Sequence, residues 1–275
     1  MLDVSCIIIN YNTSNYTLDA VKSILKKHDE TLKYEIIVVD NASEMKDYSL
    51  LKDNLTALKQ ENIKLIRSKI NLGFGGGNML GVLHSSPTIY YAFINNDTVQ
   101  INKNCLTVLK EFMDAQSNAG ICSPQMVDEN LNFRVTIDHF SSIQREILRR
   151  PLLEALFPKT YLNRKIEYDR PTRVHYVQGS FLFIKASDFK AAGGFDTNLF
   201  LFYEESDISR RFLKQLNKQT YLIPQLKYIH YKSASIQKNI QIKIEQKISL
   251  LYYIEKHFGW WHKIILNIYF IIRYF

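Results

Sequence analysis

The sequence predicts an α/β fold in which helices flank a mainly parallel central sheet. Short, largely apolar runs at 4–9, 35–40, 63–67 and 89–94 alternate with segments of helical periodicity. Runs with little polar alternation are typical of strands covered on both faces, as strands are in parallel sheets. A chain of 275 residues that is 46% hydrophobic and 23% charged can bury such a core.

The first two predicted strands each end in polar residues. The first leads into Asn10 and Tyr11, and Thr13 or Ser14 is expected to cap the next helix. The second ends at Asp40, which can either face a ligand or cap the helix expected at about 45–60. Because parallel strands present their carboxyl ends at one edge of a sheet, these polar tips predict a ligand-binding cleft there.

A glycine-rich segment at 71–78 opens the next predicted helix. Its three consecutive glycines permit positive φ and a close approach of backbone to a ligand. It does not fit a dinucleotide-binding loop, because Asn78 stands at the last glycine position and two strand–helix units precede it. No Gly-Lys-Ser/Thr follows, so it is not a P-loop, and alone the segment is a weak signal.

The predicted strand at 89–94 breaks abruptly into Asn95, Asn96 and Asp97. A carboxylate flanked by amides at a strand end can hold a divalent cation through oxygen ligands. A plain Asx-rich turn has the same composition, so the triplet alone leaves both interpretations open. A helix at about 103–113 and a strand at 120–122 are expected to follow.

The second half offers three further candidates. An irregular, partly helical insertion is expected at 126–172, and an extended stretch at 175–184 is broken at Gly179, where backbone can approach a ligand. Glu204 and Glu205 begin a cluster of acids that can serve chemistry or simply complement a helix dipole. His230 lies on an apolar strand, where a histidine is more often structural.

Taken in order, these motifs resemble family 2 glycosyltransferases of the rhamnosyltransferase-like type. The resemblance covers residues 1 to about 235. It is carried by Asn-Tyr-Asn at 10–12, Val-Val-Asp-Asn-Ala-Ser at 38–43, Asn-Leu-Gly-Phe-Gly-Gly-Gly-Asn at 71–78 and Phe-Ile-Asn-Asn-Asp-Thr at 93–98. It implies the GT-A nucleotide-sugar fold and inversion at the transferred sugar. The donor-binding residues that it implies are Asn10, Tyr11, Asp40, Gly73, Asn95 and Asn96.

The resemblance also implies a metal site and a catalytic base. Asn95 and Asp97 occupy the places of the family's Asp-x-Asp motif, and Asn95 replaces the first aspartate. That leaves Asp97 as the expected ligand of Mg²⁺ or Mn²⁺, with His230 in the place of the family's late histidine. Glu205 matches the second acid of the family's Glu-Asp motif, which is the base. Glutamate in place of aspartate adds one methylene to the reach of that base.

The implied enzyme moves rhamnose or a similar hexose from a nucleotide-sugar donor to a saccharide or lipid-linked saccharide acceptor, in surface polysaccharide assembly. The glycosyltransferase domain is expected at 1–235, with a nucleotide-binding half at 1–124 and an acceptor and catalytic half at 125–235. Gly179 and Glu204 are expected on the acceptor side.

A helical tail is expected at 236–275, because its first part carries an apolar stripe of helical period, although 240–244 also alternates like a strand. The stripe consists of Ile236, Ile240, Ile244, Ile248 and Leu251. Residues 226–275 hold eight Lys or Arg against two Glu, within a net charge of +8 for the whole chain. Trp260 and Trp261 precede an apolar stretch that is too short to span a bilayer. This composition favours an interfacial segment on an anionic membrane. The alternative is a helix docked on the protein itself or on a second copy, and no oligomeric state is predicted.

Three scattered cysteines without zinc spacing, and no signal-peptide pattern after Met1, predict a cytoplasmic protein, peripheral on the inner face of the plasma membrane. No nucleic-acid partner is expected.

Two other functions remain open. A sugar nucleotidyltransferase would need a basic glycine-rich loop near the N-terminus, and residues 10–14 contain no lysine or arginine. A non-catalytic, membrane-attached carbohydrate-binding scaffold would not need Asp97, Glu205 and His230.

Overall fold

The computed structural model describes residues 1–231 and 240–274. The first half contains β1 (Leu2–Asn10), α1 (Ser14–Lys27), β2 (Tyr34–Asn41), α2 (Met45–Ala57), β3 (Ile63–Ser68), α3 (Gly73–Leu83), β4 (Thr88–Ile94), β5 (Thr98–Gln100), α4 (Cys105–Ala115) and β6 (Ala119–Val127). The second half contains β7 (Ile137–Asp138), α5 (Ile143–Leu156), β8 (Thr172–Val174), β9 (Tyr176–Val177), β10 (Phe181–Lys185), α6 (Ala186–Ala191), α7 (Glu204–Leu216), β11 (Gln219–His230), α8 (Ile240–Phe258) and α9 (Trp260–Tyr274).

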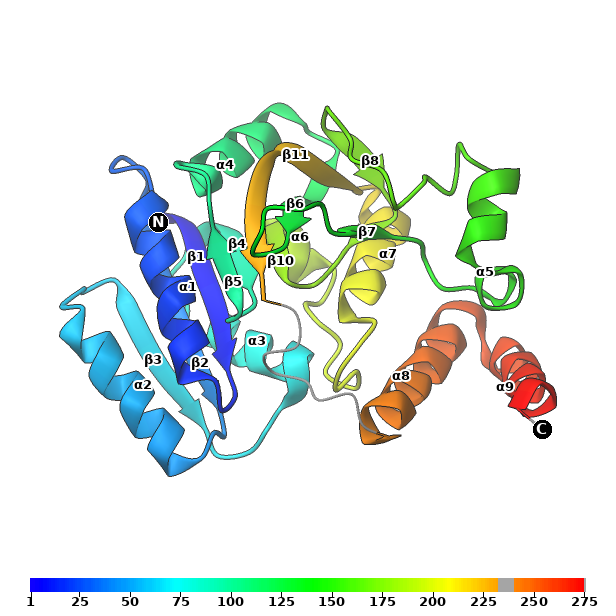
Figure 1. Cartoon of the computed structure of the whole chain (residues 1–275), viewed down its shortest axis with the longest axis horizontal. Coiled ribbons are helices and arrows are strands. Elements are labelled where there is room, and N and C mark those ends of the chain that lie inside the picture. The colour runs from blue at the N-terminus through cyan, green and yellow to red at the C-terminus, as the bar shows by residue number, and fades with distance from the viewer. Residues whose placement is uncertain (232–239, 275) are drawn as a thin grey trace.

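A nine-stranded sheet forms the centre of the molecule, in the order β3-β2-β1-β4-β10-β6-β11-β5, with β8 pairing on β11 (Figure 1). Buried side chains on one face pack with α1, α2 and α4, and those on the other face pack with α3, α6 and α7. The strands β1 to β4 are parallel and carry almost continuous apolar runs. The predicted α/β fold with flanking helices is therefore confirmed.

The other half of the sheet has mixed pairing. β10 runs antiparallel to both of its neighbours, β4 and β6. It does so because the chain returns from the 128–180 segment at the carboxyl end of β4, where Phe181 pairs with Ile94. The short strand β5 was not predicted, since three residues carry no readable periodicity. Its antiparallel pairing with β11 sets His230 opposite Thr98, beside Asp97.

The start of α1 differs from the expected cap. Thr13 occupies the N-cap position, but its side chain makes no capping hydrogen bond. Instead Asp47 of α2 accepts a hydrogen bond from the Ser14 amide at 3.0 Å. The Thr13 hydroxyl is left to accept one from the Asn96 side chain at 2.6 Å. A cap from another element cannot be read from local sequence.

The tail forms two helices that lie at one end of the molecule, beyond α7 (Figure 1). The apolar stripe expected along α8 does not face the protein: Ile240, Ile244 and Ile248 are exposed. The next face round the helix, which carries Tyr253 and Ile254, is the buried one. Ile236, which the sequence placed on the same stripe, lies outside the described residues. Among the described helices, none is both long and apolar enough to cross a membrane.

Candidate active site

A pocket of about 260 Å³ opens beyond the carboxyl end of β4. It lies between that strand end, the loop from β9 to β10, and the start of α7. Five of the residues singled out from the sequence line it together, although 135 positions separate the first from the last: Asn95, Gly179, Glu204, Glu205 and His230.

The two glutamates at the start of α7 are held in unequal environments. Glu205 lines the pocket and is half-buried, and burial raises its pKa to about 7, helped by the nearby charge of Asp138. Glu204 is only 2% exposed, and burial together with the charge of Glu205 raises its pKa well above the ordinary value. Glu204 is therefore the uncharged member of the pair near neutral pH, and Glu205 can change its protonation state there.

The backbone that delivers these glutamates is unusual. Phe202 and Tyr203 both have φ near +70°, a left-handed conformation that side chains with a Cβ rarely adopt. Together they turn the chain sharply into α7. Gly179 faces the Glu205 carboxylate, because a Cβ built at Gly179 would lie 3.8 Å from Glu205 Oε2. Gly179 therefore leaves space beside the carboxylate.

Asp97, which is buried, and His230, which is partly exposed, form a pair beside the pocket. Asp97 Oδ1 lies 3.1 Å from His230 Nε2, and this carboxylate oxygen has no hydrogen-bond partner. A carboxylate oxygen and an imidazole nitrogen at this spacing fit two positions in the shell of Mg²⁺ or Mn²⁺. Among the described residues, no group of three His, Cys, Asp or Glu side chains is placed to hold a metal ion. Any further ligands must therefore come from other groups, such as phosphate oxygens or water.

Asn10 and Asp40 lie at the carboxyl ends of adjacent strands, in register with each other, and neither is exposed. The Asn10 side chain donates to Asp40 Oδ1 at 3.1 Å, and Arg67 Nε lies 3.4 Å from Asp40 Oδ2. Thr17 extends this network, donating to Asn10 at 2.7 Å and accepting from Asn96 at 3.0 Å. These predicted donor residues thus adjoin one another, but they do not line the pocket.

Tyr11 and Gly73 have different surroundings again. Tyr11 is 43% exposed at the tip of β1. Gly73 is buried with φ of +70°, and a Cβ there would lie 2.1 Å from the Phe200 carbonyl oxygen. Only glycine fits this close approach of two chain segments. The position therefore fixes the loop before α7 against the start of α3.

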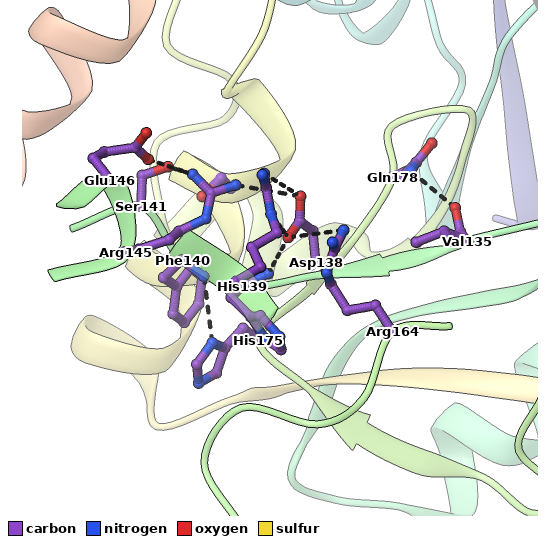
Figure 2. A network of polar contacts seen from close by, with 12 residues as sticks. Val135, Asp138, His139, Phe140, Ser141, Arg145, Glu146, Arg164, His175 and Gln178 are labelled. Carbon is purple, nitrogen blue, oxygen red and sulfur yellow. Dashed lines mark hydrogen bonds and ion pairs between the residues drawn. The ribbon is translucent and has the colours of Figure 1, made fainter. Parts of the chain in front are cut away.

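Sequence reasoning missed a polar cluster on the far side of the pocket. Asp138 accepts two hydrogen bonds of 2.7 Å from Arg150 and one of 3.3 Å from Arg145, and Arg164 lies 3.5 Å away (Figure 2). Asp138, Arg145 and Arg150 all line the pocket. The many arginines in the predicted insertion were the sequence feature that could have indicated this cluster. Nothing in the sequence indicated Asp138 as the residue around which they gather.

The family model described as glycosyl transferase family 2 matches residues 5–190. The chain belongs to this family. Curated relatives agree with it: the N-acetylglucosaminyl-diphospho-decaprenol L-rhamnosyltransferase of Mycobacterium tuberculosis is 23% identical over 217 residues, which are 73% of this chain and 69% of that protein. The low-salt glycan biosynthesis hexosyltransferase Agl10 of Haloferax volcanii is 21% identical over 211 residues, 76% of this chain and 61% of that one.

Solved structures support the family 2 fold. A structure of GalNAc-T7 with UDP, GalNAc and Mn²⁺ superposes with a TM-score of 0.69 at 18% identity, covering 95% of this chain. This chain spans 49% of the length of that structure. The mannosyltransferase PcManGT of Pyrobaculum calidifontis, with GDP-Man and Mn²⁺, gives 0.62 at 14% identity, over 93% of this chain and 66% of that one. The predicted family and GT-A fold are confirmed.

Proposed function

We propose that this family 2 glycosyltransferase inverts configuration as it moves a hexose, such as rhamnose, from a nucleoside diphosphate to a saccharide hydroxyl. One observation carries the proposal. A carboxylate with a pKa near 7, on Glu205, shares one pocket with Asn95 and with His230 of the Asp97 pair. A base and a group that can neutralise a diphosphate are what such a transfer requires at adjacent places.

In this proposal Glu205 accepts the proton of the acceptor hydroxyl as that oxygen bonds to the anomeric carbon. An alcohol is a far weaker acid than a carboxylic acid, so proton transfer has to accompany bond formation rather than precede it. A pKa near 7 makes Glu205 a stronger base than an ordinary glutamate. The turn at Phe202 and Tyr203 and the space at Gly179 position its carboxylate toward the pocket.

Asp97 and His230 would hold a Mg²⁺ or Mn²⁺ ion. When bound, the cation supplies positive charge that stabilises the departing nucleoside diphosphate. The Asn95 amide adds a neutral polar group at the same strand end. Two solved structures with the same fold contain Mn²⁺ together with UDP or with GDP-Man.

We assign the nucleoside to the strand ends around Asn10, Tyr11 and Asp40, and the acceptor to the Gly179 and Glu204 side of the pocket. The M. tuberculosis relative is named for an acceptor whose sugar is joined through a diphosphate to a lipid. A lipid-linked saccharide in surface polysaccharide assembly is accordingly the acceptor class that we propose here.

We further propose that α9 attaches the protein to an anionic membrane surface, with the active site on the cytoplasmic side. α9 turns Leu266 and Phe270 toward α8 and leaves the opposite face exposed. That exposed face consists of Trp261, Ile264, Ile265, Ile268, Ile271 and Ile272. An outward apolar face within a strongly basic segment suits lipid headgroups that carry negative charge.

The test of the activity is a panel of nucleotide sugars, titrated into the full chain with Mn²⁺ or with a chelator, together with an assay for sugar release or transfer. We expect one donor to bind and turn over only when the cation is present. Asp97→Ala should remove the cation dependence along with most of the affinity, whereas Asp53→Ala on the exposed face of α2 should change neither. Equal donor affinity with and without chelator would refute the metal assignment, and saturable binding without turnover would favour the scaffold function.

A further inference from the structure

A second pocket, of about 360 Å³, lies behind the active site and has no part in the proposed reaction. Its walls come from β7, β8, the inner face of α7, the start of β11 and the loop after α5. We call it the basic pocket and define it by Lys159, Arg173, His175, Ser209 and Lys218, together with the shared residue Asp138.

Positive charge dominates the basic pocket. In the part of the chain that the structure describes, neither Lys159 nor Arg173 forms an ion pair, and Lys218 has one carboxylate, that of Asp188, 3.9 Å away. The only acid among the lining residues is Asp138. Its charge is already offset by Arg145, Arg150 and Arg164. Two cations without partners in a concave site produce a field that attracts an anion.

Neutral donors accompany these cations. Ser209 is only 1% exposed, and its hydroxyl has no hydrogen-bond partner, which is costly for a buried polar group unless a ligand or water satisfies it. His175 stacks on Phe140 at 4.8 Å, and its Nδ1 lies 3.3 Å from the Phe140 amide (Figure 2). An Nδ1 that accepts from this amide places the proton of the neutral ring on Nε2, where it can be donated.

The histidine ring is neutral at physiological pH. Burial, followed by the neighbouring His139, Arg210 and Arg173, lowers the pKa of His175 to about 4. The basic pocket therefore combines exposed cations, Lys159 and Arg173, with uncharged donors. Arg173 presents a planar fork of donors, which matches the oxygens of a phosphate better than a single point charge does.

Asp138 separates the two pockets, since it lines both. Ser209 lies four residues after Glu205, one turn further along α7, so one helix serves both sites. Residues assigned to the nucleotide, at the ends of β1 and β2, line neither pocket. A ligand in the basic pocket would thus occupy a place separate from that of the donor.

We propose that the basic pocket is a second binding site, specific for a small phosphate-bearing molecule and distinct from the nucleotide site. Lys159 and Arg173 bind the phosphate oxygens, and the Ser209 hydroxyl donates to the same group. The volume is in the range of pockets that hold small metabolites. The proposal concerns binding alone and stands whether or not the proposed transfer reaction is correct.

The experiment titrates inorganic pyrophosphate into the full chain by calorimetry in chelator, and repeats the titration in Mg²⁺ with and without saturating UDP, because the proposed nucleotide site requires the cation. We expect saturable binding that UDP does not displace. The double variant Lys159→Gln/Arg173→Gln should weaken it by at least about tenfold, since each charge-assisted hydrogen bond is worth that much. Ser209→Ala should weaken it by a factor of several, in line with the roughly 1 kcal/mol of a neutral hydrogen bond.

The matched control is Lys165→Gln/Arg170→Gln, which removes the same charge from exposed positions in the same segment, outside the pocket. We expect it to leave pyrophosphate binding unchanged. Equal loss in the control would show non-specific attraction to a basic surface and overturn the proposal. So would displacement by UDP, or no saturation by about 10 mM, a concentration at which binding energy is under 3 kcal/mol. Acetate binding as tight as pyrophosphate binding would overturn the phosphate specificity.

Discussion

The adjacent residues Glu204 and Glu205 show how position within one helical turn decides what a carboxylate can do. Both residues line the pocket, but Glu204 is almost fully buried and one of its oxygens has no partner, whereas Glu205 is half-buried. Both have raised pKa values because burial disfavours the charged form. We assign the base to Glu205 because it is the more accessible of the two carboxylates. The two residues therefore form a matched pair for mutagenesis.

We predict that Glu205→Gln retains donor affinity within a few-fold but lowers kcat by about 10²–10⁴, because an amide of the same size cannot accept a proton. Glu204→Gln should keep most of the activity, since it replaces one uncharged group by another. Calorimetry with the donor and initial-rate assays measure the two effects separately. If Glu204→Gln is the variant that binds without turning over, the base has been assigned one residue too late.

The protonation of Glu205 also predicts a pH profile. The base acts in its ionised form, so with a pKa of about 7 in the free enzyme, kcat/KM should fall below pH 7. The fall should be about tenfold per pH unit, as expected for one required deprotonation. An ordinary glutamate would keep full activity down to about pH 5. A kcat/KM that stays flat between pH 5 and 8, with the fold intact by circular dichroism, would rule out Glu205 as the base.

At the scale of elements, the sequence predicted correctly those strands that consist of long apolar runs. The strands β1, β2, β3 and β4 were predicted within a few residues of their observed bounds. The short strand β5, the antiparallel direction of β10 and the inward face of α8 were not. Pairing partners lie far away in sequence, and the exposed isoleucines of α8 carry the same helical period as a buried face. The spacing of hydrophobic residues therefore predicted helix α8, but not which face of α8 packs against the protein.

The candidate site followed the same division. Motif order indicated Asn95, Asp97, Glu205 and His230, and the structure brings these four to one region. The roles of these residues stay predictions. Asp138 escaped notice because a single aspartate inside an arginine-rich segment has no local signal. Its importance comes from the three arginines that surround it in space.

α7 and α8 are joined through Asp207, which is fully buried. Its carboxylate accepts from Arg211 Nε at 2.8 Å, and Lys256 Nζ and His257 Nε2 lie 2.7 and 2.8 Å away. Burial opposes ionisation of Asp207. The hydrogen bond from His257 and the charges of Arg211 and Lys256 nevertheless lower its pKa to about 2. A pKa below the unfolded value of 3.8 stabilises the fold at pH above 4, and this stabilisation is lost as the pH falls through 2.

We predict that Asp207→Asn lowers the free energy of unfolding at pH 7 by roughly 3 kcal/mol, because it leaves buried cations without their partner. For a chain of this size the melting temperature should fall by on the order of 10 °C. Asp53→Asn, on the exposed face of α2, is the matched control and should change it little. The difference between Asp207→Asn and the parent protein should shrink as pH is lowered from 4 to 2. A constant difference over that range would contradict the assignment to the Asp207 charge.

At the scale of the whole molecule, the outward faces of α8 and α9 are gathered at the end opposite β3 and α2 (Figure 1). We predict that Trp260→Ser/Trp261→Ser reduces co-sedimentation with anionic vesicles while leaving the melting temperature within a few degrees. Both side chains are more than half exposed, and burial of apolar surface in a membrane contributes about 25 cal/mol per Å². The variant Ile240→Ser compares these tryptophans with a single exposed residue of α8. Co-sedimentation with neutral vesicles measures how much of the binding depends on charge.

Two outcomes would separate the alternatives for that surface. No vesicle binding by the full chain at low salt would refute membrane attachment. A concentration-dependent dimer that the tryptophan variant abolishes would assign the face to a second copy of the chain.

The contacts that join α7 and α8 also determine where this chain can be truncated or fused to another protein. The family match ends at residue 190, and sequence motifs suggest a boundary at 235. Yet the helix that carries Glu205 is held by the Tyr253 hydroxyl, which accepts from Ser206 and Arg210, and by Lys256 and His257. We therefore expect the fragment 1–258 to unfold cooperatively and bind donor, and the fragment 1–235 to fail in both, as circular dichroism melts and calorimetry can show. Homology marks the part of the chain that is shared with relatives. A module that can be moved intact into another protein has to extend to the last residue that supports the helix carrying Glu205.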